Sequence, residues 1–215
     1  MKPRILGVIP ARGGSKRLPK KNILDVAGKP LIAWTIEAAQ RARFLSDFVV
    51  STEDNEIKRV AERYGAKVLD RPKELATDKS TTLEVLQHAL KHNPADVIVL
   101  LQCSCPIRSK SLIDKCIKKF LASNVECLAT GRMVNEGEWG TYNTNPYNYL
   151  SKTKKKGYFH DDGTIYIFKS GIINKNKLYT KNNMQIISTR EESIDINDEF
   201  DLWIAEQILA RVQNE

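Results

Sequence analysis

The chain has 215 residues, of which 41% are hydrophobic, so it is long enough to bury a substantial core in one domain. No stretch approaches the roughly 18 apolar residues that a membrane-spanning helix needs, and the start of the chain does not have the pattern of a signal peptide. The net charge of +8 favours anionic partners. Because one loop is dense in cations and the other lysines are dispersed, we expect a small polyphosphate ligand, with no nucleic acid and no membrane surface as partner.

Short apolar runs and stretches of helical periodicity alternate along the chain. We predict strands at 5–10, 48–51, 66–69, 96–101, 127–130 and 164–168, and helices at 31–43, 56–64, 80–92, 109–122 and 200–212. This order predicts an α/β protein with a doubly wound, mostly parallel sheet covered by helices on both faces. Ligands of such sheets bind beyond the carboxyl ends of the strands, so the loops after Ile9, Leu101 and Thr130 are expected to meet at one edge.

The periodic pattern is lost between residues 132 and 159, a stretch rich in Asn, Gly, Tyr and Lys. We expect residues 1–215 to form a single domain from which 132–159 projects as a small dimerisation arm. A long irregular segment inside a compact domain is unusual, and aromatic side chains are typical of protein interfaces. We therefore predict a homodimer whose contacts include Trp139, Tyr142, Tyr147 and Tyr149.

The four cysteines lack the spacing of a zinc site, and a chain of this size does not need disulfides. We interpret them as reduced thiols and expect a cytoplasmic protein. Cys103 and Cys105 flank Ser104 in a candidate site loop, where either one is a candidate for a reactive thiol, but a small buried residue is the favoured interpretation.

The strongest local signal is the cationic loop at residues 11–22, which follows the first predicted strand. Two adjacent glycines allow backbone N–H groups to approach anionic oxygens closely, and five cations can add charge-assisted contacts. These cations are Arg12, Lys16, Arg17, Lys20 and Lys21. The spacing is neither that of a Walker A loop nor that of a dinucleotide-binding loop. The alternative is a solvated basic loop after an edge strand.

The segment from Ile9 to Lys16, followed by Lys21 and Asn22, resembles the opening signature of the acylneuraminate cytidylyltransferases. This family includes the CMP-sialic acid synthetases and their relatives for legionaminic and pseudaminic acids. Four further segments resemble the family in the same order: 71–80, 100–108, 162–166 and 193–202. The resemblance implies a Rossmann-like nucleotidyltransferase that transfers CMP from CTP to an acidic nine-carbon sugar and releases pyrophosphate.

The resemblance also implies the roles of individual residues. The catalytic residues would be Arg12, Lys16, Lys21 and Asp195. The nucleotide and acceptor would be bound by Ala11, Arg12, Gly13, Ser15, Lys16, Lys21, Asn22, Arg71, Ser80 and Gln102. Among these, Asn22, Arg71 and Ser80 would read the cytosine and ribose, and Gln102 would contact the sugar acceptor. On sequence alone, Arg71 is equally well interpreted as a surface charge before Pro72.

The expected cofactor is Mg²⁺, which binds one or two carboxylates together with phosphate oxygens. The family pattern has two aspartates two residues apart, which Asp195 matches at the first position, whereas Asn197 offers only a neutral carbonyl oxygen at the second. We assign the metal site to Asp195 and Asn197, with Asp198 as a substitute ligand. For Asp198 and Glu199, however, we favour capping of the last helix.

Two other functions remain open from the sequence. Residues 137–140 and the following tyrosines depart from the acceptor segment expected for sialic acid. This departure leaves open a nucleotidyltransferase that acts on a phosphorylated acceptor and yields a CDP- or other NDP-product. The asparagine at position 197 leaves open a catalytically inactive nucleotide-binding homologue.

Overall fold

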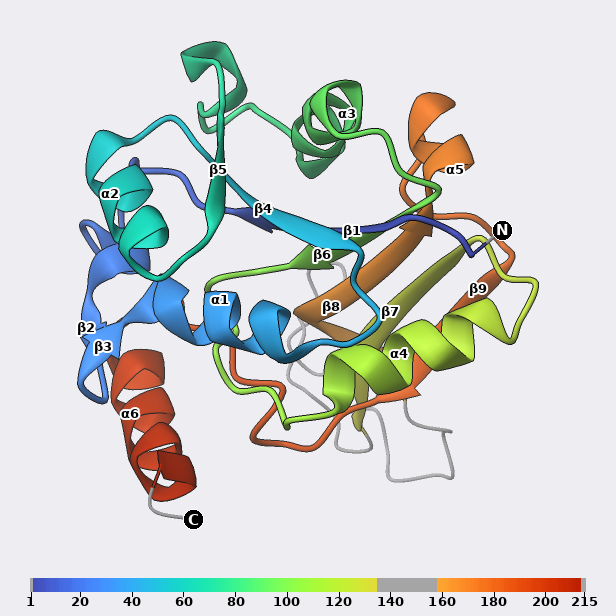
Figure 1. Ribbon diagram of the computed structural model, residues 1–215. Helices are drawn as coiled ribbons and strands as arrows, with labels where there is room; N and C mark the ends of the chain where they lie inside the picture. Colours follow the sequence, from blue (N-terminus) through green and yellow to red (C-terminus); the bar gives the residue numbers. More distant parts are fainter. Residues whose placement is uncertain (1, 135–157, 214–215) are drawn as a thin grey trace, which may run out of the picture.

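A computed structural model describes residues 2–134 and 158–213 and contains a central sheet of seven strands (Figure 1). Their order across the sheet is β5-β4-β1-β6-β8-β7-β9. The strands are β1 (Ile5–Pro10), β4 (Asp47–Thr52), β5 (Lys67–Asp70), β6 (Val97–Leu101), β7 (Cys127–Val134), β8 (Tyr158–Lys169) and β9 (Asn183–Ile187). The predicted α/β class is therefore confirmed.

The sheet is mostly parallel, with one antiparallel strand. Strands β5, β4, β1 and β6 pair in parallel, and β7 pairs in parallel with β9. Strand β8 is antiparallel to both of its neighbours, β6 and β7. Apolar periodicity carries no information about strand direction, so the sequence could not predict this reversal.

Helices cover both faces of the sheet (Figure 1). On one face lie α1 (Leu31–Arg41), α2 (Asn55–Arg63) and α4 (Leu112–Leu121), and on the other lie α3 (Thr82–His92) and the short α5 (Ser170–Asn174). Strand β1 shows how the sequence divides between the two layers, because its side chains alternate. Ile5 and Ile9 belong to the α1–α2–α4 core, whereas Leu6 and Val8 belong to the α3–α5 core.

A third, smaller core joins the C-terminal helix α6 (Glu199–Gln213) to the rest of the domain. It includes the hairpin formed by β2 (Asp25–Val26) and β3 (Lys29–Pro30), together with Trp34 and Leu209. Two 3₁₀ turns, η1 (Lys21–Ile23) and η2 (Lys73–Leu75), complete the elements. Among the described residues, no helix has both the length and the apolarity needed to cross a membrane.

The two ends of the stretch that the sequence predicted to be irregular are strands. Strand β7 continues to Val134 and β8 begins at Tyr158, and these two residues pair with each other in the antiparallel ladder. The sequence had suggested a loop after Thr130, but β7 continues past this residue. The ladder is irregular between the pairs Ala129–Tyr166 and Gly131–Asp161, where β8 has more residues than β7. Residues 135–157, with the predicted interface aromatics, lie outside the described residues.

Arg108 is buried and connects three elements near the carboxyl end of β6. Its guanidinium donates to Thr35 Oγ1 on α1 at 2.9 Å, to the Gln102 carbonyl at 2.7 Å and to the Thr164 carbonyl on β8 at 3.0 Å. It thereby fixes the loop after β6 against both the sheet and α1.

We predict that Arg108→Ala lowers the free energy of unfolding by about 3 kcal/mol or more, because several buried acceptors lose their donor. Urea denaturation followed by circular dichroism measures this change. The exposed neighbour Lys110 provides the control, and Lys110→Ala should change stability by no more than about 0.5 kcal/mol. Equal stability of the two variants would contradict the assigned role of Arg108.

Candidate active site

Three segments that are distant in sequence meet beyond the carboxyl ends of β1 and β6, which lie side by side. Ile196 is central to this meeting. Its N–H donates to the Ser104 carbonyl at 2.8 Å, and its carbonyl accepts from Lys21 Nζ at 2.7 Å. The loop after β1, the loop after β6 and the segment before α6 thus form one polar region, which confirms that the first two loops converge.

A cationic cavity of about 360 Å³ lies between the loop after β1 and the segment before α6. Six of its seven lining residues belong to the loop that the sequence singled out, namely Arg12, Ser15, Lys16, Arg17, Lys21 and Asn22, and the seventh is Asn197. Four of these side chains are cations, and the lining contains no carboxylate. The cavity is therefore suited to a compact polyanion.

The loop after β1 is held in shape by contacts that leave its cations at the cavity. Asn22 donates from Nδ2 to the Arg12 carbonyl at 2.9 Å. The Gly13 N–H donates to Glu53 Oε1 at 2.8 Å, and a side chain at this position would collide with Asp54 at the start of α2. The Gly13 amide is therefore already occupied by a carboxylate of the protein. In this loop, side-chain cations rather than this glycine amide supply the charge at the cavity.

A second cavity, of about 270 Å³, opens beside the first, and Arg12 lines both. The other residues that line it are Pro10, Arg71, Leu75, Ala76, Thr77, Asp78, Ser80, Thr81, Thr82, Val85 and Gln102. The structure thus brings the predicted Arg71, Ser80 and Gln102 together on one cavity wall. Ala11, by contrast, is buried and lines neither cavity.

Arg71 is buried, not a surface charge at a turn: its side chain is 4% exposed. Its Nη2 pairs with Glu53 Oε2 at 2.8 Å, whereas its Nε–H has no hydrogen-bond partner. A buried donor without an acceptor is costly, so the site gains if a ligand supplies one. Ser80 differs, because its hydroxyl donates to the Glu74 carbonyl and accepts from the Thr77 N–H at 3.0 Å.

Two acidic residues with direct roles at these cavities were not predicted from the sequence. Glu53 joins Gly13 to Arg71, and Asp78 contacts Arg12 and Lys16. Glu53 follows the carboxyl end of β4, which is the signal that could have identified it. Asp78 lies in one of the segments that resemble the family, but the resemblance implied no role for its carboxylate.

Asp195 is partly buried, and both of its hydrogen-bond donors are neutral. Cys105 Sγ lies 3.7 Å from one carboxylate oxygen, and Asn197 Nδ2 lies 2.9 Å from the other. The Asn197 oxygen accepts from Arg17 at 3.0 Å, so this amide presents its nitrogen to Asp195. In the described residues no group of three or more His, Cys, Asp and Glu side chains could hold a metal.

Asp198 caps α6, as favoured from the sequence. Its Oδ1 accepts hydrogen bonds from the backbone N–H groups of Phe200 and Asp201, each at 3.0 Å. Asp201 in turn accepts from the Asn197 N–H at 2.8 Å. These two carboxylates are used at the helix N-terminus, which separates them in role from Asp195.

The cysteines near the site are buried thiols. Burial raises the pKa of Cys103 and of Cys105 to about 12, so neither is a thiolate at neutral pH. The Cys105 Sγ lies 3.2 Å from the Asp162 carbonyl and 3.7 Å from Asp195, and its single proton is donated to one of these acceptors at a time. The interpretation as small buried residues is confirmed.

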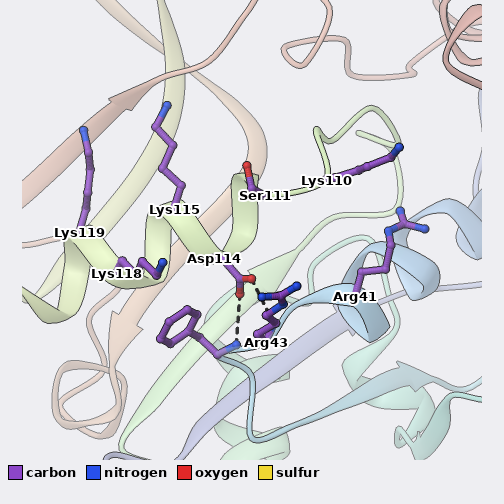
Figure 2. Close-up of a pocket in the computed structure, with 9 residues that line it drawn as sticks. Arg41, Arg43, Lys110, Ser111, Asp114, Lys115, Lys118 and Lys119 are labelled. Carbon is purple, nitrogen blue, oxygen red and sulfur yellow. Dashed lines mark hydrogen bonds between the residues drawn. The ribbon is translucent and has the colours of Figure 1, made fainter. Parts of the chain in front are cut away.

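A wider hollow of about 980 Å³ lies elsewhere, between the end of α1 and α4 (Figure 2). Arginine and lysine side chains surround it, and its one carboxylate, Asp114, accepts hydrogen bonds from the backbone N–H groups of Arg43 and Phe44. None of the predicted site residues lines this hollow, so the two smaller cavities define the candidate site.

Adjoining cavities at the carboxyl edge of a mostly parallel sheet, one cationic and one lined by a buried arginine, define a nucleotide-binding α/β protein. The sequence matches the model of the family described as "Cytidylyltransferase" over residues 6–212. The chain belongs to this family and is a nucleotidyltransferase.

Several curated proteins are similar to the chain along its length. It is 31% identical to the N-acylneuraminate cytidylyltransferase of Escherichia coli, over 95% of this chain and 52% of that protein, so it spans about half of that relative. It is 30% identical to the pseudaminic acid cytidylyltransferase of Campylobacter jejuni, over 98% and 97% of the two chains. The CMP-N,N'-diacetyllegionaminic acid synthase of Legionella pneumophila is 32% identical, over 96% of each chain.

A similar solved structure is that of a CMP:2-keto-3-deoxy-manno-octonic acid synthetase complexed with CTP. It has a TM-score of 0.77 and 18% sequence identity, over 97% of this chain and 99% of the other. At this identity the likeness establishes the fold, including the mostly parallel sheet.

We predict that Asp198→Ala lowers the free energy of unfolding by about 1 kcal/mol, because the first turn of α6 loses its cap. Nucleotide affinity should remain unchanged, since the carboxylate binds helix N–H groups. Chemical denaturation and a nucleotide titration measure the two effects. Glu199→Gln is the control for removing one charge in the same turn. A loss of nucleotide binding in Asp198→Ala without a loss of stability would contradict the assigned role.

Proposed function

We propose that this chain transfers CMP from CTP to a hydroxyl of an acidic nine-carbon sugar of the sialic acid type and releases pyrophosphate. The observation that carries the proposal is the pair of adjoining cavities that share Arg12. One has the cations for a triphosphate, and the other has polar side chains for a nucleoside. The names of the relatives, which include sialic, pseudaminic and legionaminic acid enzymes, support the choice of acceptor.

We assign the triphosphate to the cavity lined by Arg12, Lys16 and Lys21, with Ser15 on the same wall. Asn22, which was expected to read the nucleoside with Arg71 and Ser80, lines this cavity and not theirs. The nucleoside then extends into the cavity lined by Arg71 and Ser80. The buried Nε–H of Arg71, which has no partner in the protein, can donate to an acceptor oxygen or nitrogen on a cytosine edge. Gly13 and Ala11 act through the backbone: the Gly13 N–H donates to Glu53, and the Ala11 N–H donates to the Ser51 carbonyl at 3.0 Å.

In the proposed reaction, the acceptor hydroxyl oxygen forms a bond to the α-phosphorus of CTP. The bond between the α-phosphorus and the bridging oxygen breaks, and pyrophosphate leaves with the electron pair. The hydroxyl proton passes to solvent. Arg12, Lys16 and Lys21 stabilise the negative charge that grows on the leaving pyrophosphate, and the fixed cavities align the two reactants.

The donor set fits a magnesium ion with few protein ligands. Asp195 offers a carboxylate whose present hydrogen-bond donors are neutral, and Mg²⁺ commonly takes one carboxylate with phosphate oxygens and water. When bound, the ion would lower the pKa of an oxygen nucleophile and neutralise phosphate charge. We propose Asp195 as its main ligand. Asn197 would contribute only after its amide oxygen turns away from Arg17.

We place the acceptor near the carboxyl end of β6. Gln102 follows this strand, and its side-chain amide lies against Gly163, where an added Cβ would be 3.5 Å from Gln102 Nε2. Gly163 has a φ of +74°, which allows the chain to turn beside the amide. Gln102 can therefore reach a substrate that lies beyond the carboxyl end of β6, beside the turn at Gly163.

Two further proposals concern the setting of the enzyme. The homodimer through residues 132–159 stays a prediction supported by the aromatic composition of that segment. The cytoplasmic location is supported by four free cysteines, which suit a reducing compartment.

We predict that CTP binds more tightly than ATP or GTP, because the nucleoside cavity is small and its buried donor suits a pyrimidine edge. Lys16→Ala should weaken CTP binding by about 1.5 to 3 kcal/mol if a charged hydrogen bond is lost. Isothermal titration calorimetry measures both effects. Lys67→Ala is the control, since this lysine lies on β5 and pairs with Asp47. Equal affinity for all nucleoside triphosphates would contradict the proposed preference for cytidine.

We predict that Asp195→Asn removes most turnover, because the main metal-binding carboxylate is lost, while CTP binding in the absence of metal is retained. Asn197→Asp should lower the magnesium concentration needed for half-maximal rate, since it adds a second carboxylate. Pyrophosphate release across a magnesium series measures both variants. Wild-type turnover of Asp195→Asn at low magnesium would mean that the metal binds elsewhere.

A further inference from the structure

Asp78 lies where the two cavities meet. It lines the nucleoside cavity, and its two carboxylate oxygens contact two residues that line the cationic cavity. Oδ1 accepts from Arg12 Nη1 at 2.9 Å, and Oδ2 lies 2.6 Å from Lys16 Nζ. One carboxylate thus spans two cations in the way that two oxygens of a phosphate group would.

The Asp78 side chain is not needed to shape its own loop. The neighbouring residues Thr77 and Ser80 hold the turn through their own hydrogen bonds, since Ser80 accepts from the Thr77 N–H and donates to the Glu74 carbonyl. The turn also contains a bond from the Ser80 N–H to the Thr77 carbonyl at 3.2 Å. The Asp78 carboxylate, in contrast, contacts the cations of a different loop. It can leave them without disrupting the turn.

The contact is also accessible. The side chains of Asp78 and Lys16 are 51% and 78% exposed, so an incoming anion can reach both partners from solvent. The two cations hold the pKa of Asp78 below its usual value, so the carboxylate is charged at neutral pH. Exposed ion pairs are weak, so a polyphosphate with several charges can displace the aspartate.

We propose that Asp78 is an internal counter-ion of the polyphosphate site, which occupies Arg12 and Lys16 in the free enzyme and is displaced when triphosphate or pyrophosphate binds. This inference rests on the proposed function, because it takes these cations as triphosphate ligands. As a consequence, part of the binding free energy of any polyphosphate is used to break the ion pairs of Asp78. The affinity for the product pyrophosphate is therefore lowered. Asp78 then favours departure of pyrophosphate, since the carboxylate recaptures both cations.

The opposite role would give the opposite result. If Asp78 held Arg12 and Lys16 in the geometry that the ligand needs, its removal would weaken binding. The sign of the change in affinity therefore separates a competing carboxylate from a positioning one. Pyrophosphate without metal is the suitable probe, because it isolates the cations from the base, the sugar and any metal ligand.

The experiment is a calorimetric titration of inorganic pyrophosphate into the full chain in the presence of EDTA, for wild type, Asp78→Asn, Lys16→Ala and the double variant. We expect Asp78→Asn to bind pyrophosphate about three- to tenfold more tightly, the range for relief of one or two exposed ion pairs. In the Lys16→Ala background the same change should give a smaller gain. Asp47→Asn is the matched control: it removes the same charge from an exposed pair with Lys67, and we expect unchanged affinity.

Weaker binding by Asp78→Asn would overturn the proposal in favour of a positioning role, and unchanged binding would reduce the contact to an ordinary surface ion pair. A gain of equal size in Asp47→Asn would also overturn it, because net charge alone would then explain the effect. If Lys16→Ala binds pyrophosphate as tightly as wild type, the proposed triphosphate site is itself contradicted. Failure of the proposed function is thus distinguishable from failure of the role of Asp78. Thermal unfolding of each variant in the same buffer verifies that it is folded.

Discussion

The parallel pairing of β1 with β6 is the constraint on which the site depends. Because the two strands lie side by side and run in the same direction, the loops that follow them leave the sheet at the same edge. Ile196 then joins the segment before α6 to both loops, through the Ser104 carbonyl and the Lys21 side chain. The cations proposed to bind phosphate, the amide proposed to contact the acceptor and the carboxylate proposed to bind the metal therefore come from three distant parts of the chain.

The balance of charge at this edge explains much of the arrangement. The loop after β1 gathers cations that would repel one another in the absence of anions, and Arg71 adds a further cation beside them. Two carboxylates of the protein offset this charge. The Glu53 side chain is only 14% exposed and pairs with Arg71, so it stabilises the wall of the nucleoside cavity. Asp78 is exposed and faces Arg12 and Lys16, so it competes with ligands in the proposal above. Burial thus distinguishes a carboxylate that belongs to the scaffold from one that a ligand can replace.

The sequence predicted the fold class, the main helices and the cationic loop, because apolar periodicity and a cluster of like charges are local signals. It also predicted that Asp198 caps α6, since a capping residue acts within one helical turn. It did not predict the direction of β8, the extension of β7 to Val134 or the partners of Arg71. Each of these depends on contacts across the sheet or between loops, which leave no local pattern in the sequence. The family resemblance brought Arg71 and Gln102 to attention, whereas no pattern indicated that Glu53 joins Gly13 to Arg71.

The central claim is that the chain moves the α-phosphate of CTP, with its nucleoside, to an acidic sugar. The most direct measurement uses CTP labelled at the α-phosphate, with magnesium and a panel of nine-carbon acidic sugars and phosphorylated acceptors, followed by separation of the products. The account predicts that the label appears in a CMP-sugar of an acidic acceptor, with one pyrophosphate released per transfer. Label found only in a product of a phosphorylated acceptor would contradict the account. Tight CTP binding with no labelled product from any acceptor would instead indicate an inactive nucleotide-binding homologue.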